Sequence, residues 1–267
     1  MPFIRSFSID SSDRHAFPFN VPAVIHARNV LLPGAVAIFV GDNGSGKSTL
    51  LESLASKLRL SGIGGGLDME DGDYAAAREI IPRLTITWNR EIQAGGFFFR
   101  AEDFSNFLRG LDRERVKINH DLFELKGVVD DSIIKKMEES ANWKLRAMRK
   151  EYGDNMQAYS HGEGFLKILE QRMKGKGIFM LDEPEAALSP LRQLSLISMI
   201  MQMAAKGNAQ FIMATHSPIL MGIPNATIYQ VTEVGMEQVA YRETTHYSIT
   251  KNFLDNPEGF LRYLEDV

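Results

Sequence analysis

Residues 41–49 read Gly41-Asp42-Asn43-Gly44-Ser45-Gly46-Lys47-Ser48-Thr49, and this stretch decides the fold. An apolar run, residues 36–40, comes directly before it, and a helical pattern follows from residue 50. The spacing G-x-x-x-x-G-K-S between a strand and a helix is typical of a phosphate-binding loop. The glycines let the backbone adopt positive φ and approach phosphates, while successive N–H groups form an anion-binding nest. The alternative, a glycine-rich turn before an ordinary helix, does not require this full spacing.

The loop therefore predicts a site for a nucleoside triphosphate with Mg²⁺. Lys47 is expected to reach the β- and γ-phosphates, and Ser48 to place its hydroxyl on Mg²⁺. The other predicted nucleotide contacts come from the same loop: Asn43, Gly44, Ser45, Gly46 and Thr49.

A second apolar run, residues 177–183, ends in Asp182 and Glu183. It reads as a buried parallel strand whose carboxyl end faces a ligand crevice. Asp182 is predicted to hold Mg²⁺, and Glu183 to polarise the attacking water. A strand that ends in two solvated acids is the alternative, and the residues that follow, 184–190 (Pro-Glu-Ala-Ala-Leu-Ser-Pro), weaken it.

Asp182-Glu183-Pro184 with its small, Leu-containing turn resembles the Walker B motif and D-loop of ABC-type ATPases. Tyr159-Ser160-His161-Gly162-Glu163 resembles the ABC signature, although Ser-x-Gly-Glu also suits any N-capped helix. A third segment, residues 211–216, resembles a strand that ends in the H-loop histidine, His216. The motifs follow one another in the ABC order, and this order carries more weight than each motif alone.

The chain departs from the transporter pattern at His161 and Glu163, where transporters usually carry glycine and glutamine. Thr215-His216-Ser217-Pro218 is more similar to the SMC- and RecF-like branch and its small stand-alone relatives. Residues 224–257 also resemble a group of compact predicted ATPases of bacteria and phages.

The resemblance implies ATP hydrolysis with Mg²⁺, with Lys47, Glu183 and His216 as catalytic groups. His216 would contact the γ-phosphate and couple it to Glu183. The signature residues Ser160, Gly162 and Glu163 would contact ATP bound to a partner chain, in a head-to-tail homodimer that ATP closes. Two residues are candidates for the Q-loop position. Gln93 has the right residue type, whereas Glu102, a further candidate metal ligand, has the expected position.

The expected fold is α/β, of the ABC-type P-loop ATPase kind, with a mixed sheet, flanking helices and an antiparallel N-terminal part. A single ATPase domain would divide into a core, residues 1–102 and 177–267, and an inserted helical subdomain, residues 103–176, which carries the signature. Residues 61–72 predict a mobile loop after the P-loop helix. Helices over residues 188–206 and 248–265 are expected to pack on the sheet.

The chain has 267 residues, a formal net charge of −4 and no cysteine, which excludes disulfides and thiolate chemistry. No apolar run approaches the ~20 residues of a membrane span, so a cytoplasmic protein without membrane insertion is expected. Basic residues between 135 and 150 are interleaved with acids and favour a solvated helix, but nucleic acid stays a possible partner. Three functions remain: a soluble ATPase that switches an unidentified protein partner or acts on nucleic acid, the nucleotide-binding subunit of a transporter, and a P-loop kinase.

Overall fold

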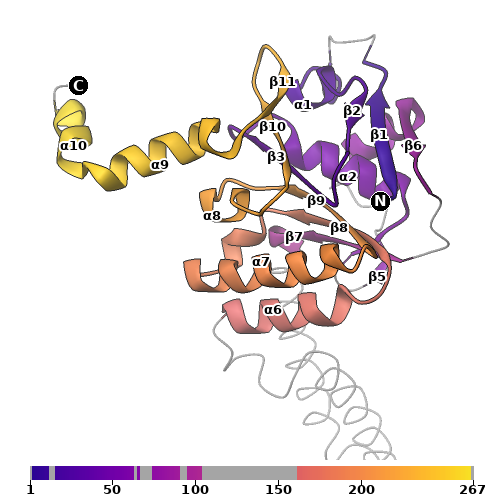
Figure 1. Cartoon of the computed structure of the whole chain (residues 1–267). Coiled ribbons are helices and arrows are strands. Elements are labelled where there is room, and N and C mark those ends of the chain that lie inside the picture. Colours follow the sequence, from indigo (N-terminus) through magenta and orange to yellow (C-terminus); the bar gives the residue numbers. More distant parts are fainter. Residues whose placement is uncertain are drawn as a thin grey trace, which may run out of the picture.

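The computed structural model describes residues 2–11, 16–62, 65–66, 74–90, 95–103 and 161–265. Within these residues the main sheet has eight strands in the order β11–β10–β3–β9–β8–β7–β4–β5 (Figure 1). The strands are β3 (Val36–Gly41), β4 (Ser61–Gly62), β5 (Gly65–Gly66), β7 (Gly96–Arg100), β8 (Gly177–Asp182), β9 (Ala209–Ala214), β10 (Thr227–Val231) and β11 (Met236–Val239). The two outer strands are antiparallel to their neighbours and the six inner strands are parallel. The carboxyl ends of β3, β8 and β9 therefore meet at one edge of the sheet.

A second, antiparallel sheet has the order β2–β1–β6, with strands Val30–Leu31, Ile4–Ile9 and Leu84–Trp88. The buried side chain of Gln210 joins this sheet to β9. Its Oε1 accepts hydrogen bonds from the N–H groups of Phe3 and Ile4 at 2.9 and 2.8 Å, and its Nε2 donates to Ile4 O at 3.0 Å. The mixed sheet and the antiparallel N-terminal part confirm the predicted fold class.

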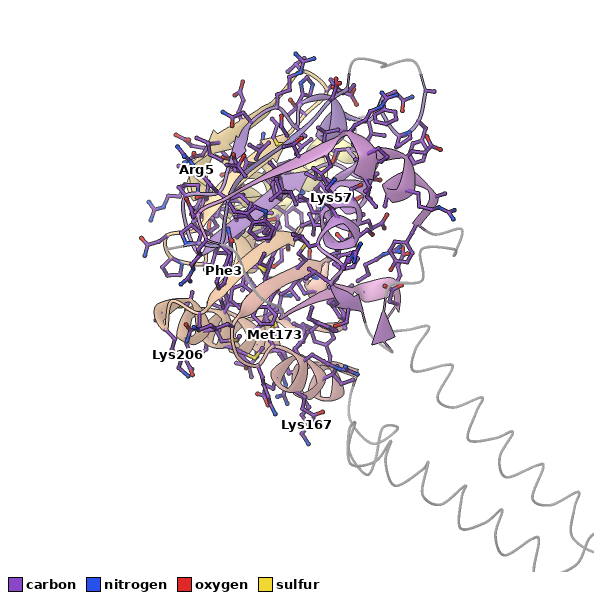
Figure 2. The ribbon with its side chains drawn as sticks, turned by 90° about the vertical axis from the view of Figure 1, so that its right-hand side faces the viewer. Phe3, Arg5, Lys57, Lys167, Met173 and Lys206 are labelled. Carbon is purple, nitrogen blue, oxygen red and sulfur yellow. The ribbon has the colours of Figure 1, made fainter. Side chains whose placement is uncertain are left out.

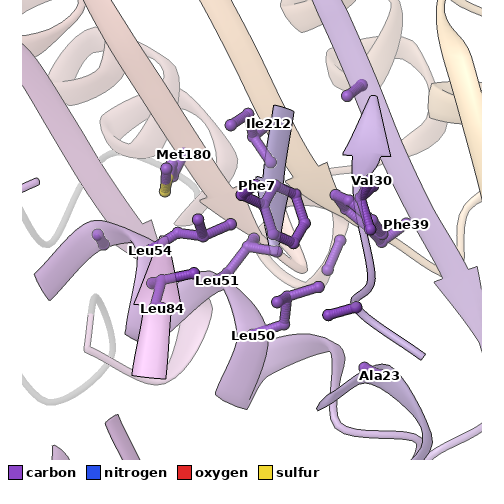
Figure 3. Packing of buried hydrophobic residues seen from close by; sticks show 14 of the residues in the cluster. Phe7, Ala23, Val30, Phe39, Leu50, Leu51, Leu54, Leu84, Met180 and Ile212 are labelled. Atoms are coloured by element: carbon purple, nitrogen blue, oxygen red, sulfur yellow. The ribbon is translucent and has the colours of Figure 1, made fainter. Parts of the chain in front are cut away.

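Helix α2 (Lys47–Lys57) lies between the two sheets. Its residues Leu50, Leu51 and Leu54 are fully buried and pack among side chains from β1, β6, β8 and β9 (Figure 3). Phe39 of β3 stacks on Tyr229 of β10, with ring centroids 5.5 Å apart. This core fixes the start of α2, and with it the P-loop.

The opposite face of the main sheet is covered by α6 (His161–Arg172), α7 (Pro190–Ala205) and α8 (Pro218–Met221). Successive residues of β7 are buried on opposite faces of the sheet. Phe97 and Phe99 face α6, whereas Phe98 faces α2. Figure 2 shows Lys167 on the outer side of α6, and Met173, just after that helix, is buried against the sheet. Helix α6 therefore packs on the core, and the helical subdomain over residues 103–176 stays a prediction.

The remaining short helices are α1 (Pro22–Ile25), α3 (Ala75–Ile80), η2 (Ile81–Arg83), η3 (Pro184–Ala187) and η4 (Tyr241–Glu243). A mobile loop was expected from residue 61, after α2. Its first residues instead form β4 and β5, a small antiparallel pair at the edge of the sheet. The rest of that loop lies outside the described residues.

The chain ends in two helices, α9 (Thr245–Asp255) and α10 (Pro257–Glu265), which project away from the body (Figure 1, yellow). The prediction that the helical stretch over residues 248–265 packs on the sheet is wrong. Pro257 starts a new helix, and α9 has no buried residue. A helical period predicts an apolar face but does not say which surface covers it. No helix in the described part of the chain is long and apolar enough to cross a membrane.

Candidate active site

The P-loop connects β3, which is buried along its whole length, to α2. Gly44 and Gly46 have φ angles of +81° and +86°, in the left-handed region that favours glycine. At Gly46 a Cβ atom would also lie 2.6 Å from Val21 Cγ2. Gly46 is the N-cap of α2 and has no side chain to cap the helix, so among the described residues no cap hydrogen bond occupies the first-turn N–H groups. Such a terminus binds anions.

Lys47 is buried, and its ammonium group lies over the loop. Nζ donates to Gly41 O at 2.8 Å, to Asp42 O at 2.9 Å and to Ser45 Oγ at 3.3 Å. Burial lowers the pKa of Lys47, while the nearby acids, Glu183 first, oppose this shift. Asn43 and Gly44 are exposed at the tip of the loop, and Thr49 is half-buried. Of the predicted loop residues, Ser45 therefore contacts the Lys47 ammonium group directly, together with the carbonyl oxygens of Gly41 and Asp42.

Asp182, at the end of β8, is buried and accepts a hydrogen bond from the Ser48 hydroxyl. Burial raises the pKa of Asp182 to about 7, with the Ser48 hydrogen bond opposing the shift. Its Oδ1 is buried without a hydrogen-bond partner among the described residues. The Ser48 hydroxyl and the unpaired Oδ1 of Asp182 fit a Mg²⁺ site. This ion binds few protein oxygens and keeps waters or phosphates as its other ligands. No cluster of three or more His, Asp or Glu suited to a metal occurs in the described part of the chain.

Glu183 adopts a left-handed conformation, with φ 48° and ψ 48°, which is strained for a residue with a side chain. Its N–H group donates to Ala214 O of β9 at 2.9 Å, which holds this turn against the sheet. Its side chain is 45% exposed. The turn therefore presents a carboxylate to solvent one residue beyond the buried Asp182.

His216 follows the end of β9 and faces Glu183, with His216 Nε2 3.6 Å from Glu183 Oε1. Its backbone N–H donates to Glu185 Oε1 at 2.6 Å, which fixes the backbone at this point. Its Nδ1 lies 3.0 Å from Nε2 of His246, in the first turn of α9. Burial lowers the pKa of His216, and the positive charge of Lys47 acts in the same direction. The structure thus brings His216 and Glu183 together.

His246 is the residue that sequence reasoning missed. It lies in the segment Thr245-His246-Tyr247, which resembled relatives but carried no assigned role. A histidine in the first turn of a helix gives no signal by itself, and only the contacts of this turn with β10 and η4 place it here.

The other predicted site residues either are not joined to Ser48 and Asp182 or lie outside the fully described residues. The Glu102 side chain is 79% exposed and pairs with Arg100 Nη2 at 2.9 Å, so the structure does not join it to Ser48 and Asp182. Gly162 and Glu163 fall in the first turn of α6, of which the backbone alone is described. Ser160, Gln93 and the basic residues 135–150 lie outside the described residues.

The parallel strands, the P-loop and the acids at the end of β8 define a P-loop ATPase of the ABC type. The model of a family described as "AAA domain, putative AbiEii toxin, Type IV TA system" matches residues 89–222, half of the chain. The chain belongs to this family. The matched segment contains Asp182, Glu183 and His216, whereas the P-loop lies before it.

Similar solved structures include a "putative metal-chelate type ABC transporter" in an inward-facing conformation, with 17% identity, a TM-score of 0.44, and coverage of 94% of this chain and 88% of that chain. CbiO1 from Clostridium perfringens, part of the ABC transporter complex CbiONQ, has 16% identity, a TM-score of 0.42, and coverage of 90% and 91%. A dimeric bacterial ABC transporter cassette has 12% identity, a TM-score of 0.43, and coverage of 91% and 99%. These likenesses are too distant to carry an argument about this chain. No curated protein matches the sequence significantly.

Proposed function

We propose that this chain binds ATP with Mg²⁺ and hydrolyses it to ADP and phosphate. One observation supports this most: Lys47, the Ser48–Asp182 pair, Glu183 and His216 converge at one edge of the main sheet. They come from the ends of three different parallel strands, β3, β8 and β9, and ligands of open α/β sheets bind at such an edge.

In the proposed reaction a water oxygen attacks the γ-phosphorus, the bond to the β–γ bridging oxygen breaks, and the water proton passes to Glu183. Lys47 and the loop N–H groups bind the phosphates. His216 Nε2 donates to Glu183 or to a γ-phosphate oxygen. Mg²⁺, held by Ser48 and Asp182, would neutralise phosphate charge.

ATP binding is tested first with Lys47→Ala. The loss of two or more charge-assisted hydrogen bonds, each about 1.5–3 kcal/mol, should weaken ATP affinity about 10²-fold or more. Lys57→Ala is the matched control, because Lys57 ends the same helix and its Nζ contacts Ile81 O at 3.0 Å, away from the loop. Titration calorimetry with Mg-ATP measures both. Equal affinity in wild type and Lys47→Ala would overturn the assignment of the P-loop.

We further propose that ATP closes a head-to-tail homodimer in which Ser160 contacts the γ-phosphate on the partner chain. Light scattering of Glu183→Gln should show a shift from monomer to dimer on addition of Mg-ATP. Ser160→Arg should abolish this shift and keep ATP binding, whereas Ser198→Arg, on the exposed side of α7, should leave it intact. A monomer at every ATP concentration would refute the dimer and leave the ATPase proposal standing.

The closed dimer would switch a partner protein or act on nucleic acid. Glu183→Gln with ATP traps the closed state, so co-purification in that state, with Lys47→Ala as the control, would identify the partner. A retained membrane permease would instead favour a transporter subunit.

A further inference from the structure

The first turn of α9 is fixed to the sheet, although the rest of the helix is exposed. Thr244, the N-cap, is fully buried, and its hydroxyl oxygen accepts from Tyr247 N at 3.3 Å. Thr245 N donates to Gln230 Oε1, on β10, at 3.1 Å. The Tyr247 ring lies 4.7 Å from that of Tyr241. The two hydrogen bonds of Thr244 and Thr245 hold His246 beside His216, which follows the end of β9.

His246 contacts His216 through ring nitrogens, with His246 Nε2 3.0 Å from His216 Nδ1 and ring centroids 5.1 Å apart. At this distance one nitrogen donates a proton and the other accepts it. Burial lowers the pKa of His246, as it does that of His216, and Lys47 adds to both shifts. Both shifts favour the neutral rings, in which one nitrogen carries the proton and the other carries a lone pair.

The position of the Glu183 carboxylate indicates which tautomer of His216 is present. His216 Nε2 lies 3.6 Å from Glu183 Oε1 and has no hydrogen-bond partner among the described residues. A lone pair on Nε2 would face the negative oxygen, whereas an N–H there attracts it. The proton of His216 therefore belongs on Nε2, and His216 Nδ1 must accept from Nε2–H of His246. This is an assignment from the hydrogen-bond network.

We propose that His246 is a positioning residue of the ATPase site: it donates to His216 Nδ1 and so holds His216 in the tautomer whose Nε2–H faces Glu183 and the γ-phosphate. The proposal rests on the proposed ATP hydrolysis. A group that orients a metal-bound histidine from its other ring nitrogen typically contributes about 10–100-fold to activity, and we expect an effect of this order for His216. Because His246 lies in the first turn of α9, the placement of the projecting helices and the tautomer of His216 depend on each other.

The first test reads the tautomer directly, without ATP. Nitrogen NMR of His216 should show one Nε2-protonated tautomer in wild type and a mixture in His246→Leu. His246→Gln should restore the wild-type spectrum, because the glutamine amide lies near the position of Nε2. His246→Asn should not, because its shorter amide stops near the position of Nδ1.

The second test is kinetic. His246→Leu should lower kcat about 10–100-fold with ATP affinity unchanged, and His246→Gln should recover most of the loss. The double variant His216→Ala/His246→Leu should be no slower than His216→Ala, because His246 acts through His216. An additive loss would refute this dependence.

Tyr247→Leu is the matched control for simple anchoring of α9. It removes the contact with Tyr241 and keeps both histidines, so the His216 tautomer should stay as in wild type. A His216 spectrum that is identical in wild type and His246→Leu would overturn the proposal. If wild type fails to hydrolyse ATP, the proposed function fails, and the NMR result still decides whether His246 sets the tautomer of His216.

Discussion

The P-loop region and the C-terminal helices reach the same site by opposite means. Strand β3 is buried along its length and α2 lies between two sheets, so many side chains fix Lys47 and Ser48. The helices α9 and α10 project from the body, and α9 has no buried residue, yet its first turn brings His246 to His216 (Figure 1). A catalytic position can therefore depend on a packed core or on a few polar contacts. Substitutions should separate the two cases.

The largest effect is expected at the reacting carboxylate. Glu183→Gln keeps the size of the side chain and removes the group that accepts the water proton, so phosphate release should fall about 10²–10⁴-fold. ATP affinity should stay unchanged. Glu258→Gln, an exposed carboxylate on α10, is the control and should keep wild-type turnover. Near wild-type turnover in Glu183→Gln would mean that another carboxylate, with Glu185 first in line, accepts the proton.

The next effect concerns the core beneath the P-loop. Phe39 is fully buried between Phe7 and Tyr229, so Phe39→Ala should lower the free energy of unfolding by about 3–5 kcal/mol. Denaturant unfolding measures this. A loss under 1 kcal/mol would show that the region around β3 can collapse onto the cavity and is less rigid than its packing implies.

A smaller, pH-dependent effect is expected where α2 meets β7. Glu52 pairs with Arg100 at 3.3 Å, and burial raises the pKa of Glu52 to about 7, with Arg100 opposing the shift. A carboxyl whose pKa is higher in the folded state stabilises the fold below its unfolded pKa, near 4.5, and loses this contribution as the pH rises through 7.

Wild type should therefore lose on the order of 2 kcal/mol of unfolding free energy between pH 5 and 8, relative to Glu52→Gln. Thermal or denaturant unfolding of both proteins over this range gives the difference. A constant difference between the two curves would show that Glu52 has the same pKa in the folded and unfolded chain.

The smallest effect is expected in the projecting helices. Phe253 is 40% exposed and contacts Phe260, with ring centroids 5.9 Å apart. Phe253→Ala should change the unfolding free energy by about 0.5 kcal/mol or less, in contrast to the same substitution at Phe39. The two variants are best measured in one denaturant series. A loss comparable to that of Phe39→Ala would mean that α9 packs against another surface in solution.

The sequence alone determined those elements that depend only on residues close together in the chain. The P-loop needs glycines at positive φ, followed by a lysine at the start of a helix, and this requirement is visible in residues 41–49. Apolar runs that end in Asp182–Glu183 and in His216 predicted the later strands within a residue or so, since a parallel strand buried on both faces must be apolar throughout.

Only the tertiary structure decided which surfaces meet. Residues 248–265 predicted a helical stretch but not whether it packs on the sheet or projects from the body. An apolar helix face does not specify the surface that covers it. The buried Gln210 bridge between the sheets and the exposed position of Glu102 follow from packing across long sequence separations. His246 shows this most clearly: its distance to His216 depends on how the first turn of α9 is held against β10, and no local pattern encodes that contact.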